Sequence, residues 1–267
     1  MDCRAIPGHC VASERLTMFR AFRSLLMAGA LLLPQAALAG EFTDKQREEI
    51  GTIVREYLVQ NPDVLVEVSQ ELERRQKLAE DEQRKNAIAE NADEIFRSSA
   101  DFVAGNPQGD VTMVEFFDYN CPWCKKSMPI VKNLLETDGK LKIVFKEFPI
   151  LGEGSEYAAR AAMASQAQGK YLEFHLALYE HAGKIDAQAV DEIAQSVGID
   201  LKKLKADMES ADIAAAIDRN LKLAQTLGIS GTPAFVIDKT VIPGYLPERA
   251  LAAAVKEVRD AGGCSIC

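Results

Sequence analysis

The chain has 267 residues, 48% of them hydrophobic and 27% charged, which is enough for one large core and an accessory segment. Its formal net charge is −9, and no segment is rich in lysine or arginine, so a nucleic-acid partner is not expected. Composition and charge together leave an enzyme, a binding protein or a surface protein as the function classes to consider.

The first 39 residues have the pattern of a secretory signal. Two arginines precede the apolar run 25–33, and a small-residue cleavage sequence ends at Ala39. We therefore expect export to the periplasm, with a signal peptide, 1–39, cleaved after Ala39. The apolar run is too short to span a bilayer, and no membrane anchor is expected. Met18 lies just ahead of the signal, and translation from it would leave residues 1–17 out.

Residues 40–97 are predicted to form a helical arm. Apolar side chains recur at helical spacing in 43–60, and the Asn-Pro pair at 61–62 ends that helix and begins another. One interpretation is a solvated linker; the other makes 43–72 an oligomerisation surface and 73–97 a spacer. The second is favoured, because two apolar helical stripes ahead of a complete domain need a partner surface.

The main domain is expected at 98–260, and it alternates strands and helices. The patterns predict, in order, a buried strand at 111–117, a helix to about 137, a strand from 141, a helical block at about 156–227, a strand after 233, a short strand at 240–242 and a final helix from 247. In the second strand, lysines alternate with the apolar positions. Residues 261–267 are expected to be a flexible tail with a second CxxC.

Cys121 and Cys124 form a CPWC motif between a strand and a helix, which is typical of a thioredoxin-like redox site. At a helix start, unpaired backbone N–H groups and the helix dipole favour the Cys121 thiolate. Stabilising the thiolate makes the disulfide more oxidising. Cys124, one turn inward, is expected to be the resolving thiol.

Three other roles for this CxxC remain open. A structural disulfide would restrain the unfolded chain little, because its loop is short. Zinc held by both CxxC pairs has a suitable ligand set. Copper(I) on thiolates is chemically reasonable as a side activity.

Two further positions belong to the predicted site. Glu115 lies inside the apolar strand, where a carboxyl with a raised pKa could carry the proton to or from Cys124; the alternative is a strand-end residue that reaches solvent. Thr232 and Pro233 precede the late strand, and their peptide bond could be cis and pack against the disulfide. The alternative is ordinary edge-strand chemistry of proline.

Cys264 and Cys267 form the second CxxC, "CSIC", at the end of the sequence. A disordered end with a small local disulfide would account for them. The alternatives are a shuttle dithiol that passes electrons to the first pair, or a clasp for a soft metal ion.

Several segments resemble the DsbA-type periplasmic thiol–disulfide oxidoreductases. They are "EFFDYNCPWC", "FKEFPILGEGSEYAARAA", "GKYLEFHLALYE", "LGISGTPAFVID" and "IPGYLPERAL", and they cover roughly 95–260. The resemblance implies an α/β fold, a thioredoxin fold with an inserted helical domain, and a cis-proline loop at Thr232 and Pro233. It also implies that Cys121 is the nucleophile, Cys124 its partner and Glu115 the buried acid.

The arm is similar to the amino-terminal segment of the ScsC (suppressor of copper sensitivity) subgroup. Better-known members of that subgroup trimerise through this region and isomerise disulfides. The resemblance therefore implies a homo-oligomer, here a trimer, and a membrane redox partner.

The predicted function is an exported thiol–disulfide oxidoreductase that acts on protein substrates as a disulfide isomerase or reductase. No organic cofactor and no resident metal is implied, and copper(I) is a secondary ligand. The alternatives are a monomeric DsbA-type disulfide donor, a copper(I)-binding protein of the copper-tolerance type, and a surface or adhesion protein on a borrowed thioredoxin scaffold.

Overall fold

The computed structural model describes residues 42–267, and the predicted signal peptide lies outside this range. The described chain divides into two units, with the boundary after Pro62. The first contains helix α1 (Asp44–Gln60), which begins with a capping box at Thr43 and buries none of its residues. None of the helices described for residues 42–267 has the length and hydrophobicity of a bilayer-spanning segment.

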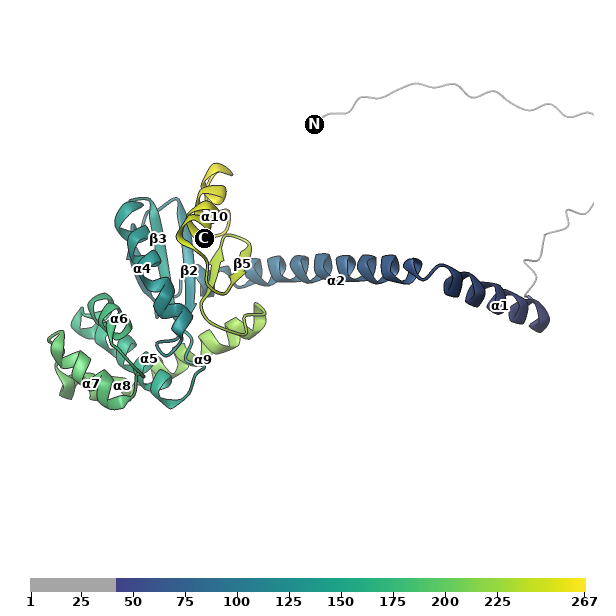
Figure 1. Ribbon diagram of the computed structural model, residues 1–267. Coiled ribbons are helices and arrows are strands. Elements are labelled where there is room, and N and C mark those ends of the chain that lie inside the picture. The colour runs from purple at the N-terminus through teal and green to yellow at the C-terminus, as the bar shows by residue number, and fades with distance from the viewer. Residues whose placement is uncertain (1–41) are drawn as a thin grey trace, which may run out of the picture. The chain divides into compact units, whose positions relative to one another are not determined.

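The second unit combines helices with a five-stranded sheet (Figure 1). Its elements, in chain order, are α2 (Asp63–Glu90), α3 (Ala92–Phe96), β1 (Phe102–Gly105), β2 (Val111–Phe117), α4 (Pro122–Thr137), β3 (Leu141–Glu147), α5 (Glu153–Ser165), a 3₁₀ turn (Gln166–Gln168), α6 (Tyr171–Glu180), α7 (Ala187–Ser196), α8 (Leu201–Met208), α9 (Ala211–Thr226), β4 (Ala234–Ile237), β5 (Thr240–Pro243) and α10 (Glu248–Asp260). Helices α5–α9 are inserted between β3 and β4 and gather below the sheet in Figure 1.

The strand order is β1-β3-β2-β4-β5, with β2 at the centre. β2 and β3 are parallel and joined through α4, whereas the other neighbouring strands are antiparallel. All seven residues of β2 are buried, as its continuous apolar sequence predicts. The edge strand β1 was not predicted, because a four-residue segment gives little alternation to recognise.

Successive side chains of β2 point to opposite faces of the sheet and therefore enter two different cores. Met113 and Phe117 pack in the core that also contains residues of α4 and α10. Val114 and Phe116 pack in a second core with residues of α3 and α9. Alternation therefore places Glu115 on the α4 face, the same face as the CPWC helix.

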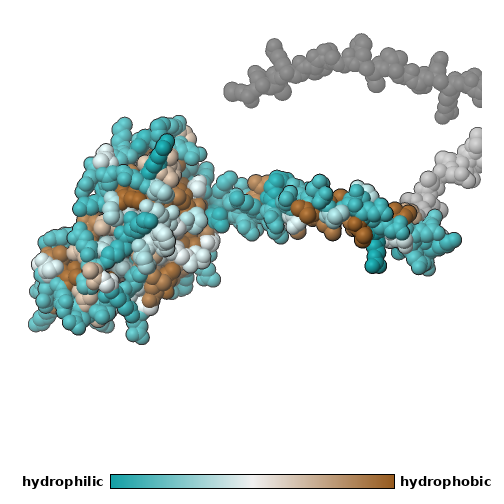
Figure 2. Space-filling view, in the orientation of Figure 1, coloured by the Kyte–Doolittle hydropathy of each residue, from teal (hydrophilic) through white to brown (hydrophobic). Residues whose placement is uncertain are grey.

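The arm ends earlier than its sequence indicates. Side chains of α2 such as Leu65, Val68 and Leu72 are more than half exposed, and Figure 2 shows hydrophobic residues along this helix. Ile88, near the end of α2, is fully buried against the sheet together with α3. The predicted spacer, 73–97, is therefore wrong in its last part, which belongs to the folded domain.

Lys146 lies in β3, the strand in which lysines alternate with apolar positions. Its side chain is fully buried, and its ammonium forms an ion pair with Asp101 and donates to the backbone carbonyl of Glu94. Asp101 also accepts a hydrogen bond from Asn220 at 3.4 Å. The Lys146–Asp101 pair links β3 to the segment before β1, and Asn220 extends this link to α9. Alternation alone does not reveal that Lys146 is buried.

Candidate active site

Cys121 and Cys124 lie at the start of α4, immediately beyond the carboxyl end of β2. Cys121 is the N-cap residue, and its sulfur accepts a hydrogen bond from the backbone N–H of Cys124 at 3.4 Å. Pro122 occupies the first helical position, where a missing N–H costs no hydrogen bond. Both cysteines are free thiols in this structure; Cys121 is 5% exposed and Cys124 only 1%.

The loop before β4 faces the first cysteine. The peptide bond between Thr232 and Pro233 is cis, and the Cys121 thiol lies 3.2 Å from the carbonyl oxygen of Thr232. A cavity of about 230 Å³ opens along this loop, and Arg84 of α2 lies at its wall. The structure thus brings the CPWC motif into contact with a loop that lies 111 residues later in the chain.

The two thiols have opposite acidities. The pKa of Cys121 is lowered to about 5, chiefly by a hydrogen bond with the Cys124 side chain, while burial opposes the shift. A hydrogen bond with the Thr232 side chain, and others with the backbone of Cys124 and Trp123, lower it further. Burial raises the pKa of Cys124 well above its ordinary value. At neutral pH, Cys121 is therefore a thiolate and Cys124 a thiol.

Glu115 lies inside β2, 4% exposed, opposite Phe145 of β3 and Phe235 of β4. Burial, followed by the charge of Cys121, raises the pKa of this carboxyl to about 8. None of the described residues forms an ion pair with it. The alternative interpretation, in which Glu115 is a strand-end residue that reaches solvent, therefore does not hold. At pH 7 the Glu115 carboxyl is mainly protonated and neutral.

Asp118 fixes the loop before the CPWC motif, and sequence reasoning missed it. Its buried carboxylate accepts hydrogen bonds from the backbone N–H groups of Asn120, Ile150 and Leu151 at 2.7–3.0 Å. It also accepts one from the Ser155 hydroxyl at 2.7 Å. The signal available in the sequence was an acidic residue directly after a buried strand.

A buried polar cluster joins the sheet to the helical insertion beneath the site, and it was also missed. Glu147 accepts hydrogen bonds from the hydroxyls of Tyr171 at 2.8 Å and Tyr119 at 3.1 Å. The Tyr119 hydroxyl also lies 3.0 Å from Nδ1 of His175. Burial raises the pKa of Glu147 and lowers that of His175 to about 3. Both groups are therefore neutral, which removes the cost of burying charge.

Exposed apolar side chains surround the mouth of the site. Trp123 is 55% exposed and lies 5.7 Å from Tyr245, centroid to centroid. The Lys126 ammonium lies over both rings, at 5.1 and 4.7 Å from their centroids. Ile150 and Leu151 are also exposed. Such a surface can contact apolar and acidic segments of a protein substrate.

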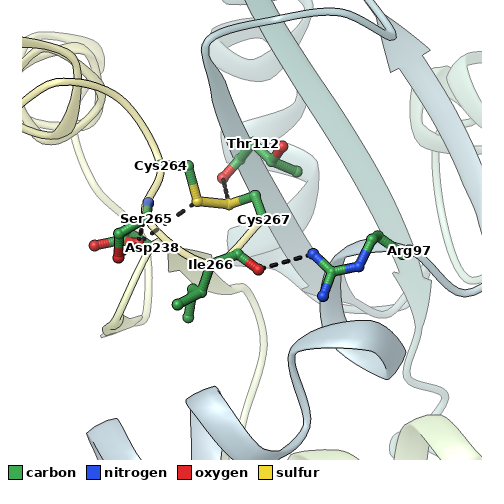
Figure 3. Close-up of a disulfide and its surroundings, with 7 residues drawn as sticks. All are labelled: Arg97, Thr112, Asp238, Cys264, Ser265, Ile266 and Cys267. Atoms are coloured by element: carbon green, nitrogen blue, oxygen red, sulfur yellow. Dashed lines mark hydrogen bonds between the residues drawn. A yellow bond between two sulfur atoms is a disulfide. The ribbon is translucent and has the colours of Figure 1, made fainter.

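The second cysteine pair is ordered, which corrects the expectation of a flexible tail. Cys264 and Cys267 form a disulfide (Figure 3). The Cys264 N–H donates to the carbonyl of Asp110, just before β2. The side chain of Arg97 donates to the carbonyl of Ile266 at 2.8 Å. These contacts hold the tail at the end of β2 remote from Cys121.

The positions of the two pairs bear on the metal alternatives. Because Cys264 and Cys267 lie at one end of β2 and the CPWC pair at the other, the described chain forms no single zinc site from both pairs. Within residues 42–267, no three His, Cys, Asp or Glu side chains are grouped as ligands of one metal ion.

A family comparison matches residues 112–256 to the DSBA-like thioredoxin domain. The matched range includes both CPWC cysteines, Glu115 and the cis-proline loop. The chain is a member of this DSBA-like family. Residues 46–79 match a second family, the copper resistance protein ScsC N-terminal domain.

Solved structures support the assignment to DSBA-like proteins. A thioredoxin-like oxidoreductase from Silicibacter pomeroyi is 46% identical, with a TM-score of 0.62, over 63% of this chain and 97% of that one. A linker-deletion mutant of Proteus mirabilis ScsC is 26% identical, with a TM-score of 0.64, over 84% of this chain and 99% of that one. The predicted α/β thioredoxin fold with a helical insertion and a helical arm is confirmed.

Among curated proteins, the Na(+)/H(+) antiporter NhaA 1 of Salinispora arenicola is 29% identical over 157 residues, which are 58% of this chain and 24% of that protein. The chain therefore spans about a quarter of the length of that relative. Family and structural neighbours together make this DSBA-like chain an enzyme of the thiol–disulfide oxidoreductase class.

Proposed function

We propose that the protein is an exported enzyme that exchanges disulfides with protein substrates through Cys121 and Cys124, as a disulfide isomerase or reductase in the periplasm. The observation that carries this proposal is the acidic N-cap thiol of Cys121, which touches the cis-proline loop. The leader of the sequence and its resemblance to periplasmic proteins support export.

The proposed mechanism assigns each step to a particular residue. The Cys121 thiolate attacks a substrate disulfide, forms a mixed disulfide and releases a substrate thiolate. Cys124 then loses its proton and attacks the Cys121 sulfur, which leaves the substrate reduced; if a substrate thiol attacks instead, the substrate is isomerised. Glu115, which titrates near neutral pH, lies on the correct face to exchange a proton with Cys124.

The arm favours isomerase or reductase use over disulfide donation. Its exposed stripe, for which Leu65, Val68 and Leu72 are representative, resembles a surface that associates with copies of itself. A homo-oligomer, which we expect to be a trimer as in ScsC relatives, presents several CPWC sites to one substrate. It would also keep the CPWC pair from the membrane redox partner that reoxidises a monomeric donor.

The test compares the wild type with a Leu65→Glu/Val68→Glu variant by light scattering and by refolding of scrambled ribonuclease. Both side chains are exposed, so the variant is expected to fold. Gln70→Glu, on the same helix, is the matched control. An oligomeric wild type that isomerises, beside a monomeric variant that does not, supports the proposal. Equal mass and equal activity of the two proteins would favour the monomeric donor instead.

Copper(I) is proposed only as a secondary ligand of the CPWC pair. The Cys121 thiolate is a suitable soft donor, but Cys124 must lose a proton from a buried thiol before it can bind. Stoichiometric copper(I) binding that a Cys121→Ser/Cys124→Ser variant loses would demonstrate this ligand. Unchanged binding by the variant would exclude the site.

A further inference from the structure

The tail disulfide differs from the CPWC pair in the hydrogen-bonding groups around its sulfurs. The sulfur of Cys264 lies 3.6 Å from a carboxylate oxygen of Asp238, and the sulfur of Cys267 lies 3.9 Å from the carbonyl oxygen of Thr112 (Figure 3). Both neighbours are acceptors, so neither stabilises a thiolate. The Cys121 sulfur also faces an acceptor, the Thr232 carbonyl oxygen at 3.2 Å, but it accepts in addition from the backbone N–H of Cys124 at 3.4 Å.

This contrast sets a direction for disulfide transfer. Stabilising the thiolate of a dithiol makes its disulfide a better oxidant, and destabilising the thiolate has the reverse effect. The CPWC disulfide is therefore the oxidant and the tail dithiol the reductant.

The two pairs of one chain are too far apart to react directly. Helix α10 ends beside Asp110, because Arg259 Nε donates to both carboxylate oxygens of that residue at 2.9 Å. Cys264 follows the end of α10 by four residues, which span at most about 14 Å. The seven residues of β2 alone span about 20 Å, and Cys121 lies beyond their far end. Transfer through Cys264 must therefore occur between chains.

The recess beside the tail is acidic, although Arg97 also contacts the tail at the Ile266 carbonyl, and the CPWC motif carries a cation. A recess of about 320 Å³ opens beside the tail, and the charged residues that line it are Asp238 and Glu257. The residue that lies over the exposed Trp123 of the CPWC motif is a cation, Lys126. An acidic recess and a basic motif can steer two copies toward each other. Cys264 and Cys267 are half-buried, so each residue is partly accessible to a partner.

We propose that Cys264 and Cys267 form a second thiol–disulfide exchange site, whose reaction partner is the CPWC disulfide of another copy of this chain. This proposal rests on the proposed function of the CPWC pair. The tail dithiol returns that pair to the reduced state once, and an external dithiol must then reduce the tail disulfide before the next transfer. The tail cysteines thus react with another copy of the chain, and their disulfide is not a purely structural one.

The transfer balances as two successive exchanges. A tail thiolate attacks the Cys121 sulfur of the other chain, breaks its disulfide and releases Cys124, which takes up a proton. The second tail thiolate then attacks the tail sulfur of this mixed disulfide and releases Cys121 as a thiolate. Two electrons pass from the tail dithiol to the CPWC disulfide, and the second tail proton goes to solvent.

The experiment mixes two full-length variants. The disulfide donor is the Cys264→Ser/Cys267→Ser variant, with its CPWC pair oxidised. The disulfide acceptor is the Cys121→Ala/Cys124→Ala variant, with its tail reduced. Acid quenching, alkylation and mass spectrometry follow both pairs over time. We expect the tail to be oxidised at a rate proportional to each concentration, with an equilibrium about tenfold or more in favour of the tail disulfide.

The same donor is also mixed with dithiothreitol. If the donor oxidises dithiothreitol but not the tail, the second exchange site is refuted while the proposed function stands. If it oxidises neither, both proposals fail. A tail disulfide that forms at a rate independent of donor concentration would refute transfer between chains.

A second variant tests the direction. Asp238 has a positive φ of 47°, a conformation that Asn tolerates, so Asp238→Asn removes the charge and keeps the backbone. In the acceptor, this change should move the equilibrium toward the reduced tail by roughly threefold to tenfold. Asp212→Asn, at an exposed position of α9, is the matched control and should leave the equilibrium unchanged. An Asp238→Asn acceptor that matches the control would overturn the assigned direction.

Discussion

Replacing Glu115 by Gln should stabilise the reduced protein by an amount that increases as pH rises from 5 to 8. The carboxyl has a pKa of about 8 in the folded chain, against an ordinary value of 4.5. Between these values the unfolded chain has released the proton and the folded chain still holds it. Glu115 therefore lowers the free energy of unfolding progressively from about pH 4.5 to pH 8.

The magnitude follows from the interval between the two pKa values. Each pH unit inside it changes the free energy of unfolding by about 1.4 kcal/mol, which gives about 5 kcal/mol over the whole interval. Below pH 4.5 both states are protonated, and the contribution vanishes. The advantage of Glu115→Gln over the wild type should therefore grow between pH 5 and pH 8 by about 4 kcal/mol.

Urea denaturation of both proteins at half-unit pH steps, with the cysteines kept reduced, measures this difference. A buried glutamine amide without partners costs a constant amount at every pH, so the slope and not the absolute difference is the result. Cys121 titrates in both proteins, so to first order its contribution cancels from the difference between their free energies of unfolding. Glu136→Gln, at an exposed position of α4, is the control and should follow the wild type. Parallel curves for wild type and Glu115→Gln would refute the buried, neutral carboxyl.

Three further predictions concern the site and the core. Alkylation of Cys121 should follow a pKa of about 5, and Cys124→Ala should raise that pKa because it removes the largest stabilising hydrogen bond; an unchanged alkylation profile would contradict this cause. Lys146→Met should lower the free energy of unfolding by about 3–5 kcal/mol in urea, since it leaves Asp101 buried without its cation; a loss below about 1 kcal/mol would argue against the pair. Ser127→Ala should raise the free energy of unfolding by about 1 kcal/mol, because the buried Ser127 hydroxyl has no hydrogen-bond partner within residues 42–267; a destabilised variant would reveal one.

The parts of the site that are continuous in sequence were predictable. The apolar run of β2 followed by CPWC specifies a strand, an N-cap cysteine and a helix, because burial and capping act locally. Thr232 and Pro233 were found through the turn chemistry of proline before a strand, and the structure places them against Cys121. Their catalytic and binding roles stay predictions.

The parts that depend on distant partners were not predictable. Lys146 alternates with the apolar residues of β3, and its burial is explained by two distant partners, Asp101, 45 residues earlier, and the Glu94 carbonyl. The tail resembles a disordered end in composition, but Asp238 accepts from both the N–H and the hydroxyl of Ser265 at 2.8 Å. A local sequence pattern does not show which distant residue will accept a given hydrogen bond.

The opposite pKa shifts of Glu115 and Cys121 have a consequence for the order of proton transfers. While Cys121 is a thiolate, its charge helps to keep the Glu115 carboxyl protonated. Formation of a mixed disulfide removes that charge, so the pKa of Glu115 falls and a larger fraction of the carboxyl ionises. In the proposed exchange, this is the stage at which Cys124, held as a buried thiol, must lose its proton to attack. In the proposed exchange, this coupling keeps Glu115 neutral while Cys121 is charged and ionises it when Cys124 needs a base. A permanently ionised carboxylate at the same position could not do both.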